Sequence, residues 1–275
     1  MTSKSIEETN QPVSFNPRHY QSILSRQRSL YRKMTESDWW ITTTLRKATE
    51  DAASKFANGL LVDIGCGGRA YSELFAPYID RYLGLDIYAS GNNLPDVYAL
   101  AQALPLASES ADVVLMSQVL EHLPEPWNCV SEAARVLKPG GVVIVSAPQT
   151  WMLHEKPFDF YRYSPFGLHY LCRHAGLNVV MERALGNGWT TLLLSTFLQG
   201  AWNAAALLKM DRTWHNVKQE TFSQKRSIMG TMVSVCSAIP FLVLNVCLSL
   251  LDRLPDAGVY SAQNLIVAQK PLNPS

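Results

Sequence analysis

Residues 60–68 place a carboxylate and closely spaced glycines directly after an apolar run, in the order Leu-Leu-Val-Asp-Ile-Gly-Cys-Gly-Gly. Asp63 offers a hydrogen-bond acceptor at the end of a buried strand. Gly65 and Gly67 permit backbone angles and a close ligand approach that a Cβ atom would prevent. The helix expected over residues 69–75 would point its N-terminal amides at the same place. These features favour binding of a cofactor that carries a nucleoside.

Asp86 supplies a second carboxylate at the end of another apolar run, residues 82–86. It follows the glycines by about twenty residues, the spacing at which an acid accepts hydrogen bonds from the hydroxyls of a ribose. Further strands are expected at 111–117 and 142–146, with a helix before the second of them. This alternation predicts βαβ units, a mostly parallel sheet and helices on both of its faces. The loops that follow the strands should then surround one cleft at their carboxyl ends.

The ordered set of motifs resembles the class I S-adenosylmethionine-dependent methyltransferases, in particular their small-molecule, type 11-like branch. The resemblance covers about residues 59–185, with a last strand at 264–270. It implies an α/β fold with a Rossmann-like, mostly parallel seven-stranded sheet, and S-adenosyl-L-methionine as the cofactor. The motifs that carry it are the glycine turn at 60–68, Leu-Pro-Leu at 104–106, Leu-Glu-His-Leu at 120–123 and Val-Leu-Lys-Pro-Gly-Gly at 136–141.

The resemblance also implies how the cofactor is held. Asp86 would bind the ribose, Ile87 would pack on the adenine, Leu104 would lie near the adenine, and Gln118 would lie near the sulfonium. The glycine turn would border the methionine end of the cofactor. The full set of expected cofactor-binding residues is Asp63, Gly65, Cys66, Gly67, Asp86, Ile87, Gln102, Leu104 and Gln118.

Two positions depart from the usual pattern of these enzymes. Arg69 stands where a third glycine is frequent. Leu100 stands where relatives often carry an acid that bonds the adenine amino group, so neighbouring Gln102 or backbone groups would have to serve. Neither change removes the glycine turn or Asp86, the acid that would bind the ribose. Both are interpreted as variation within a subgroup.

His122 is the candidate catalytic base, because an imidazole beside the donor methyl group could take the proton of a hydroxyl or phenol acceptor. If the acceptor is already nucleophilic, positioning alone would carry most of the rate. The alternative left open is a histidine that merely orders the loop after its strand. Glu121 and His122 also resemble part of a metal-binding segment of ubiquinone-type O-methyltransferases. Gln118 replaces an acid at the start of that segment, and an amide is a poorer ligand for a hard cation, so no metal ion is predicted.

The acceptor is expected to meet residues 154–164, which join the strand ending near Ser146 to a helix at 165–175. The segment resembles a loop of methyltransferases associated with bacterial polysaccharide and lipid biosynthesis. In the alternative interpretation, an ion pair within the loop only pins it, with Ser164 as helix N-cap and Pro165 as the first helical residue. The candidate acceptor-binding residues are His154, Asp159, Arg162 and Tyr163, and the pinning pair would be Asp159 with Arg162.

Two runs without formal charge, at 190–208 and 228–251, are unusual for such an enzyme. The second run is long enough to cross a bilayer, yet the chain must return to supply the last strand. Three arrangements are left open: helices that complete the core or a homodimer interface, helices lying in a membrane interface, and a two-pass hairpin. Basic residues flank the runs and could meet anionic headgroups, or could belong to an ordinary solvated turn; they are Lys209, Arg212, Lys218, Lys225 and Arg226.

We expect five segments in order along the chain. They are a disordered tail at 1–14, an N-terminal helical cap at 15–58, a methyltransferase core at 59–188, an apolar helical insertion at 189–260, and the last core strand with a tail at 261–275.

The composition is that of a folded enzyme, with 275 residues of which 47% are hydrophobic and 17% are charged. The net charge of +1 and the isoelectric point near 7.7 give no broad field for a polyanion, so nucleic acid is not an expected partner. The five cysteines are odd in number and scattered, and the first residues show no apolar secretory segment. We therefore expect reduced core cysteines and a cytoplasmic protein, with membrane association left open.

The sequence thus predicts an S-adenosylmethionine-dependent methyltransferase that acts on a small or lipid-linked acceptor, at oxygen rather than at carbon or nitrogen. One alternative is a catalytically silent cofactor-binding scaffold at a membrane, which Arg69, Leu100 and the apolar insertion would favour. The other is a nicotinamide dehydrogenase. Asp63 ahead of the glycines, and the absence of the wider G-x-G-x-x-G spacing, argue against the dehydrogenase.

Overall fold

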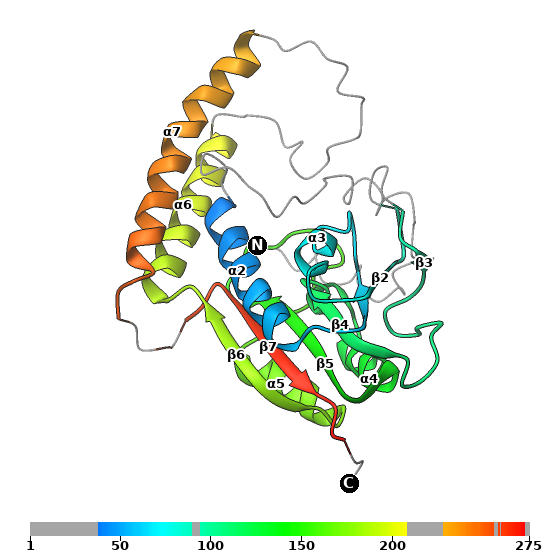
Figure 1. Ribbon diagram of the computed structural model, residues 1–275. Coiled ribbons are helices and arrows are strands. Elements are labelled where there is room, and N and C mark those ends of the chain that lie inside the picture. Colours follow the sequence, from blue (N-terminus) through cyan, green and yellow to red (C-terminus); the bar gives the residue numbers. More distant parts are fainter. Residues whose placement is uncertain (1–37, 90–93, 208–227, 256–257, 259, 273–275) are drawn as a thin grey trace, which may run out of the picture.

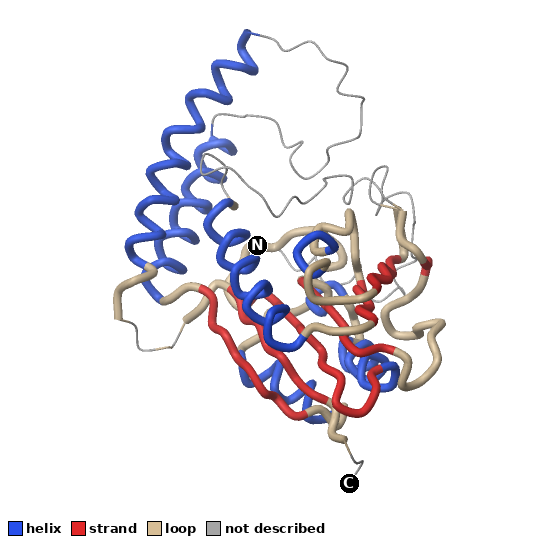
Figure 2. Tube along the Cα trace, viewed as in Figure 1, coloured by secondary structure: helices blue, strands red, loops and turns tan. Residues whose placement is uncertain are grey.

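A twisted sheet lies at the centre of the computed structural model, which describes residues 38–89, 94–207, 228–255, 258 and 260–272 (Figures 1 and 2). Its strand order is β3-β2-β1-β4-β5-β7-β6. Strands β1 to β5 run parallel, and β7 runs antiparallel to both of its neighbours. The predicted mostly parallel, seven-stranded sheet is confirmed. The strands are β1 Leu60–Ile64, β2 Arg81–Asp86, β3 Val97–Tyr98, β4 Ala111–Ser117, β5 Leu137–Pro148, β6 Asn178–Leu185 and β7 Gln263–Gln269.

Helices cover both faces of this sheet because successive residues of the buried strands point to opposite sides. On β4, Val114 and Met116 pack in one cluster with α4 and α5, whereas Val113 and Leu115 pack in another with α2 and α3. Figure 1 shows the two layers on either side of the strands. The helices are α2 Trp39–Phe56, α3 Ser72–Phe75, the short 3₁₀ helix η3 Leu120–His122, α4 Pro126–Val136, α5 Pro165–His174, α6 Gly188–Leu207 and α7 Ile228–Leu251.

Strand order changes direction at β1, because β2 lies on one side of it and β4 on the other. In open α/β sheets the ligand crevice lies at such a switch point, outside the carboxyl ends of the strands. The glycine turn at 65–68 follows β1 at that end. The fold therefore places the candidate cofactor turn where a nucleotide-type ligand is ordinarily bound.

Two predicted boundaries are wrong. The helix expected over 69–75 begins only at Ser72, because Arg69 has a left-handed φ of 59° that no α-helix accommodates. The strand expected at 142–146 is β5, which begins earlier, since Leu137 already pairs with Ala111 before the Pro-Gly-Gly stretch. A register shift between Ala111 and Val113 absorbs the extra residues.

Helices α6 and α7 form the predicted apolar pair and lie side by side along α2 (Figure 1). Leu194 of α6 and Leu244 and Leu248 of α7 are buried with Trp40 of α2. One side of the pair therefore belongs to the protein's own core. In the part of the chain that the structure describes, no helix combines the length and the hydropathy needed to span a membrane.

The other side of the pair is exposed and apolar. Its α7 residues include Ile239, Val243 and Leu250, and Trp189 and Leu192 continue the surface on α6. Cys247 is also exposed, so the expectation that all cysteines are core residues is wrong for this one, because it lies on a part of α7 that no described helix covers. Cys66, Cys129 and Cys172 are buried and free. The expected tail at 1–14, the basic residues between 209 and 226, and the side chain of Cys236 lie outside the described residues.

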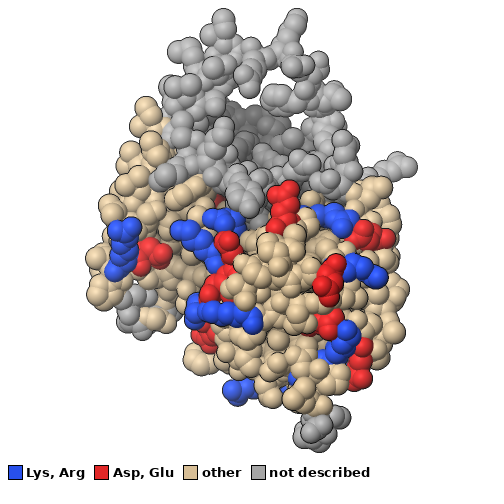
Figure 3. Space-filling view, in the orientation of Figure 1, with Lys and Arg blue, Asp and Glu red and all other residues tan. Residues whose placement is uncertain are grey.

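Charged side chains of both signs are interspersed over the described residues of the face shown in Figure 3. This distribution agrees with the near-zero net charge of the sequence. On this face, no wide region of one sign gathers over the described elements.

Candidate cofactor and acceptor site

The glycine turn after β1 requires residues without a Cβ atom. Gly65 has φ of 72° and Gly67 has φ of 50°, both in the left-handed region. A Cβ atom on Gly65 would lie 2.6 Å from Cγ2 of Val119, whereas one on Gly67 would meet nothing within 4 Å. The turn is therefore packed on its Gly65 side and open beside Gly67, where a ligand has room to approach.

Backbone amides tie this turn to the end of β2. The N–H groups of Gly65 and Cys66 both donate to the carbonyl oxygen of Leu85, at 2.8 and 3.0 Å. Gly67 N–H donates to Oδ2 of Asp86 at 2.8 Å, and Tyr88 N–H donates to Oδ1 at 3.2 Å. The two motifs singled out from the sequence are thus joined by a direct hydrogen bond. The Cys66 thiol is buried, and burial raises its pKa, so it stays protonated.

Asp86 is half-buried at the carboxyl end of β2. Burial raises the pKa of its carboxyl group, the amides of Gly67, Tyr88 and Ile87 oppose that rise, and the charge of Glu155 adds to it. A carboxylate has about four acceptor positions, and the hydrogen bonds from Gly67 and Tyr88 take one on each oxygen, which leaves capacity for ribose hydroxyls. The effect of Glu155 shows that the expected acceptor loop lies within electrostatic range of Asp86.

Asp63 is buried in β1 and accepts a hydrogen bond from the Tyr82 hydroxyl. Burial raises the pKa of Asp63 to about 7, with the Tyr82 hydrogen bond opposing the rise and the charge of Asp86 adding to it. The carboxyl group therefore lies in the same electrostatic cluster as Asp86. Its contact with the methionine end of a cofactor stays a prediction.

Stability should depend on pH through Asp63. Because its folded pKa is raised, the folded state keeps a proton that the unfolded chain releases, so the contribution of Asp63 to stability falls as pH rises from about 4 to about 7. Asp63→Asn keeps an acceptor for Tyr82 but cannot ionise. We therefore expect this variant to lack up to about 4 kcal/mol of the fall in the free energy of unfolding over this pH range. Urea unfolding of both proteins across that range measures it. Parallel stability curves would show that Asp63 is not protonated in the folded state.

Arg69 takes a backbone conformation that explains why glycine is frequent at its position. Its φ is 59°, and its guanidinium forms an ion pair with Asp96 at 2.7 Å and lies 5.0 Å from the centre of the Tyr82 ring. Asp96 also accepts from Gly84 N–H of β2 at 2.8 Å. Sequence reasoning missed both Tyr82 and Asp96, because neither belongs to a motif and only the packing of the turn on β2 brings them to the site.

The remaining expected cofactor residues lie around the same end of the sheet. Gln118 follows β4 with φ of 57°, and its side chain donates to Oγ of Ser146 on β5 at 3.2 Å. Leu104 is buried, and its N–H donates to Glu132 at 2.8 Å. Ile87 and Gln102 are half-buried in the loops after β2 and β3. Their contacts with adenine or sulfonium stay predictions.

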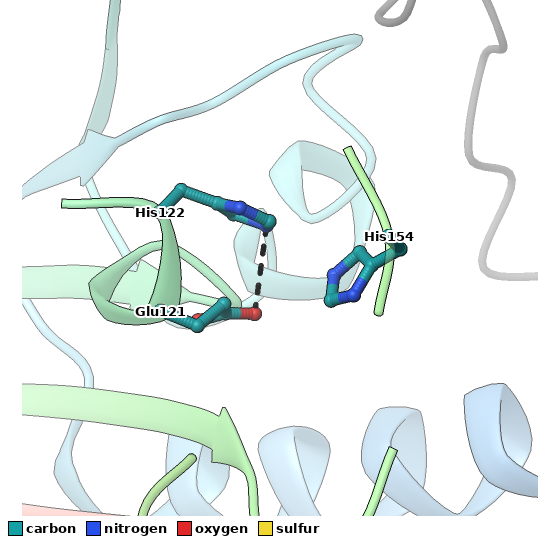
Figure 4. A group of neighbouring side chains, drawn as sticks. All are labelled: Glu121, His122 and His154. Atoms are coloured by element: carbon teal, nitrogen blue, oxygen red, sulfur yellow. Dashed lines mark ion pairs between the residues drawn. The ribbon is translucent and has the colours of Figure 1, made fainter. Parts of the chain in front are cut away.

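His122 lies in η3, directly against the loop that should bind the acceptor. Its Nδ1 is 2.6 Å from the carbonyl oxygen of Phe158, and its ring centre is 4.9 Å from that of His154. Its Nε2 is 3.8 Å from Oε1 of Glu121 and 3.4 Å from Oε2 of Glu155. Figure 4 shows the His122 and His154 rings next to each other, with the Glu121 carboxylate near both. The candidate base and one candidate acceptor residue are therefore neighbours.

The other candidate acceptor residues make contacts within their own loop. Asp159 is 1% exposed and accepts from His154 N–H and, through both oxygens, from Arg162. Burial raises the Asp159 pKa, but these donors outweigh it and hold the pKa below the ordinary value. Tyr163 is buried, with its hydroxyl donating to Leu120 O. Ser164 caps α5 through Gly167 N–H. The geometry is that of the pinning alternative, and acceptor binding by Asp159, Arg162 and Tyr163 stays a prediction.

Known proteins match the part of the chain that builds this site. A family model described as a methyltransferase domain matches residues 62–145. This part of the chain is thus similar to a methyltransferase domain. An uncharacterized methyltransferase of Mycobacterium leprae is 37% identical to it over 97 residues, which are 32% of this chain and 36% of the relative.

A second relative and one solved structure agree with the methyltransferase domain. An uncharacterized methyltransferase of Mycobacterium avium is 36% identical over 100 residues, covering 33% of this chain and 40% of the relative. The chain thus spans well under half the length of these curated relatives. The crystal structure of the cyclase SpnF aligns with a TM-score of 0.52 over 84% of this chain and 82% of that one, at 15% identity, and shows likeness of fold alone.

Proposed function

We propose that this protein transfers the methyl group of S-adenosylmethionine to a small or lipid-linked acceptor, with oxygen as the favoured atom. The observation that carries the proposal is the hydrogen bond from Gly67 N–H to Asp86 at the switch point of the sheet. It joins the open glycine turn to Asp86, the acid expected to bind a ribose, and both lie beside the polar loop at 154–164. The methyltransferase domain supports this assignment of the cleft.

The residues present fit the cofactor. Gly67 leaves space beside the turn, and Asp86 keeps acceptor capacity at the end of β2. When bound, S-adenosylmethionine supplies a methyl group attached to a positively charged sulfur. The acceptor atom bonds the methyl carbon, and the sulfur leaves with the electron pair of the carbon–sulfur bond. The chain itself has to hold the nucleoside, orient the acceptor and receive a proton if the acceptor is a hydroxyl.

The loop at 154–164 is suited to orienting an acceptor because it is held rigidly. Arg162 bonds the carbonyl oxygens of Trp151 and Met152 as well as Asp159, and Phe160 N–H donates to Glu121 O at 2.8 Å. These contacts fix His154 opposite His122. We assign proton removal from an oxygen acceptor to this pair and its carboxylate neighbours.

Radiolabelled methyl transfer tests the function. The wild-type protein is incubated with labelled S-adenosylmethionine and with lipid, glycan and small-metabolite fractions of a cell extract. We expect label to enter the lipid or small-metabolite fraction, and Asp86→Ala to abolish it. Cofactor binding without transfer to any fraction would contradict the proposal and favour the silent scaffold.

A lipid-linked acceptor is favoured by the exposed apolar side of α6 and α7. Val243 is 57% exposed there, and the sequence between the two helices is basic. Apolar area together with cationic neighbours promotes binding to anionic membranes. We propose that this side lies against a lipid surface and presents the cleft to acceptors held in it.

Vesicle binding tests this contact. Val243→Glu should weaken binding to vesicles rich in anionic lipid by about tenfold or more. It removes a valine that the lipid surface would bury and adds a charge in its place. The control is Leu272→Glu, a similar change at a residue that is 76% exposed but remote from α7. Cosedimentation measures both. Equal binding by the two variants, or no binding by the wild-type protein, would contradict membrane contact.

A further inference from the structure

Side chains of Glu121, His122 and His154 converge beside the cofactor end of the sheet (Figure 4). Each offers one ligand atom, and these atoms lie within 4.8 Å of one another. The Glu121 side chain is fully buried, and those of His122 and His154 are 9% and 20% exposed. Two come from η3 and one from the loop after β5, so two separate parts of the chain build the cluster.

Hydrogen bonds fix which nitrogen of each ring carries a proton. Nδ1 of His122 faces the carbonyl oxygen of Phe158 at 2.6 Å, and Nδ1 of His154 faces that of Met152 at 3.2 Å. A carbonyl oxygen can only accept, so Nδ1 is the donor in both rings. In a neutral imidazole, Nε2 then carries a lone pair. Histidines that bind metal ions are held in the same way, with the other nitrogen donating to a carbonyl or carboxylate.

The groups around Nε2 of His122 favour a positive charge at this place. Its Nε2 is buried and makes no hydrogen bond to the described residues, yet carboxylate oxygens of Glu155 and Glu121 lie 3.4 and 3.8 Å away. A lone pair facing two carboxylates is unfavourable. Either a proton on Nε2, which would form a charged hydrogen bond of about 2.7–2.9 Å, or a bound metal ion would relieve this. Ligand atoms around one ion with bonds of about 2.1 Å lie about 3.0–3.4 Å apart, which needs a closure of the cluster by about 1 Å.

We propose that Glu121, His122 and His154 bind a divalent transition-metal ion, with Glu155 at the edge of the site. Imidazole nitrogens with a carboxylate suit zinc or iron better than magnesium or calcium. This proposal departs from the sequence-based expectation that no metal is bound. Three protein ligands leave a coordination position open.

The open position suggests how the site would serve catalysis, a step that rests on the proposed methyl transfer. An acceptor hydroxyl bound to the ion would have a lowered pKa, and its proton would pass to the Glu155 carboxylate at the edge of the site as the oxygen bonds the methyl carbon. His122 would then act as a ligand and not as the base. The metal site itself does not depend on this step.

Zinc binding to the purified chain tests the site without any activity assay. The protein is treated with a chelator, dialysed and titrated with Zn²⁺ by calorimetry, and the bound metal is counted by elemental analysis. We expect about one ion per chain in the wild-type protein. We expect His154→Ala to weaken binding by at least about 100-fold, since loss of an outer-shell partner alone costs 10–100-fold.

The matched control is His169→Ala, because His169 also pairs with a glutamate, Glu182 at 2.6 Å, but lies on α5 outside the cluster. It should keep wild-type zinc affinity. His154→Cys, which restores a zinc ligand, should recover much of the lost affinity. Affinity for S-adenosylhomocysteine, measured on each variant, should stay unchanged, which separates failure of the metal site from failure of the cofactor site.

Two results would overturn the metal site. One is the absence of zinc binding by the wild-type protein. The other is equal zinc affinity in His154→Ala, His169→Ala and the wild-type protein, which would indicate adventitious binding to surface groups.

Discussion

Asp86→Ala is expected to weaken the binding of S-adenosylmethionine by more than about 100-fold. The carboxylate would lose two hydrogen bonds from ribose hydroxyls, and hydrogen bonds to a charged group contribute about 1.5–3 kcal/mol each. The substitution also removes the acceptor for Gly67 N–H, which holds the turn against β2. Isothermal titration of the purified variant with S-adenosylmethionine measures the loss.

Asp112→Ala is the matched control for this experiment. Asp112 is also a half-buried acid that accepts a backbone N–H, from Leu60 at 2.8 Å, and it pairs with Lys138. It lies at the opposite end of the same strands, near the start of β1. We expect it to lower stability while leaving cofactor affinity intact. Equal losses of affinity in the two variants would contradict the ribose assignment.

Gly65→Ala is expected to lower the free energy of unfolding by about 3 kcal/mol. An alanine at φ of 72° is strained by about 1–2 kcal/mol. Its Cβ would also lie 2.6 Å from Val119, and such overpacking costs a further 1–3 kcal/mol or so. Because Val119 belongs to the segment between β4 and η3, the clash should displace the His122 region as well. Urea denaturation measures the loss of stability.

Gly176→Ala is the control that measures the strain of an alanine at positive φ without a clash of its Cβ atom. Gly176 has φ of 77°, but a Cβ atom there would meet nothing within 4 Å. This variant should therefore lose only about 1–2 kcal/mol and keep cofactor affinity. If Gly65→Ala were no more destabilising than Gly176→Ala, the close packing of the turn against Val119 would be refuted.

Much of the sheet could be predicted from local patterns. Apolar runs ending in Asp63 and Asp86 indicated the positions of β1 and β2, and the parallel sheet they predicted placed the loops after them around one cleft. The direct hydrogen bond between the turn and Asp86 was not predicted. The helix after the turn was predicted too long because Arg69 has no local feature that marks a left-handed backbone. The start of β5 was missed because pairing with Ala111, and not the Pro-Gly-Gly stretch, decides where the ladder begins.

The acceptor side could be predicted only in part. His122 and His154 were singled out by type, but they belong to different loops and no periodicity brings their rings together. Arg162 was a candidate both for binding the acceptor and for pinning its loop. In the structure it bonds Asp159 and three carbonyl oxygens. A single sequence cannot tell these roles apart, because the same residue types pin loops and bind substrates. The sequence indicated Glu121 and His122 as part of a segment that binds metal in other methyltransferases, but only the structure adds His154 to the proposed metal site.

Titration of the wild-type protein with S-adenosylmethionine and, separately, with NAD shows which cofactor the cleft binds. We expect one binding site per chain for S-adenosylmethionine, strongly weakened in Asp86→Ala and kept in Asp112→Ala, and no comparable binding of NAD. Binding of NAD in preference to S-adenosylmethionine, or binding of neither by folded protein, would contradict this expectation.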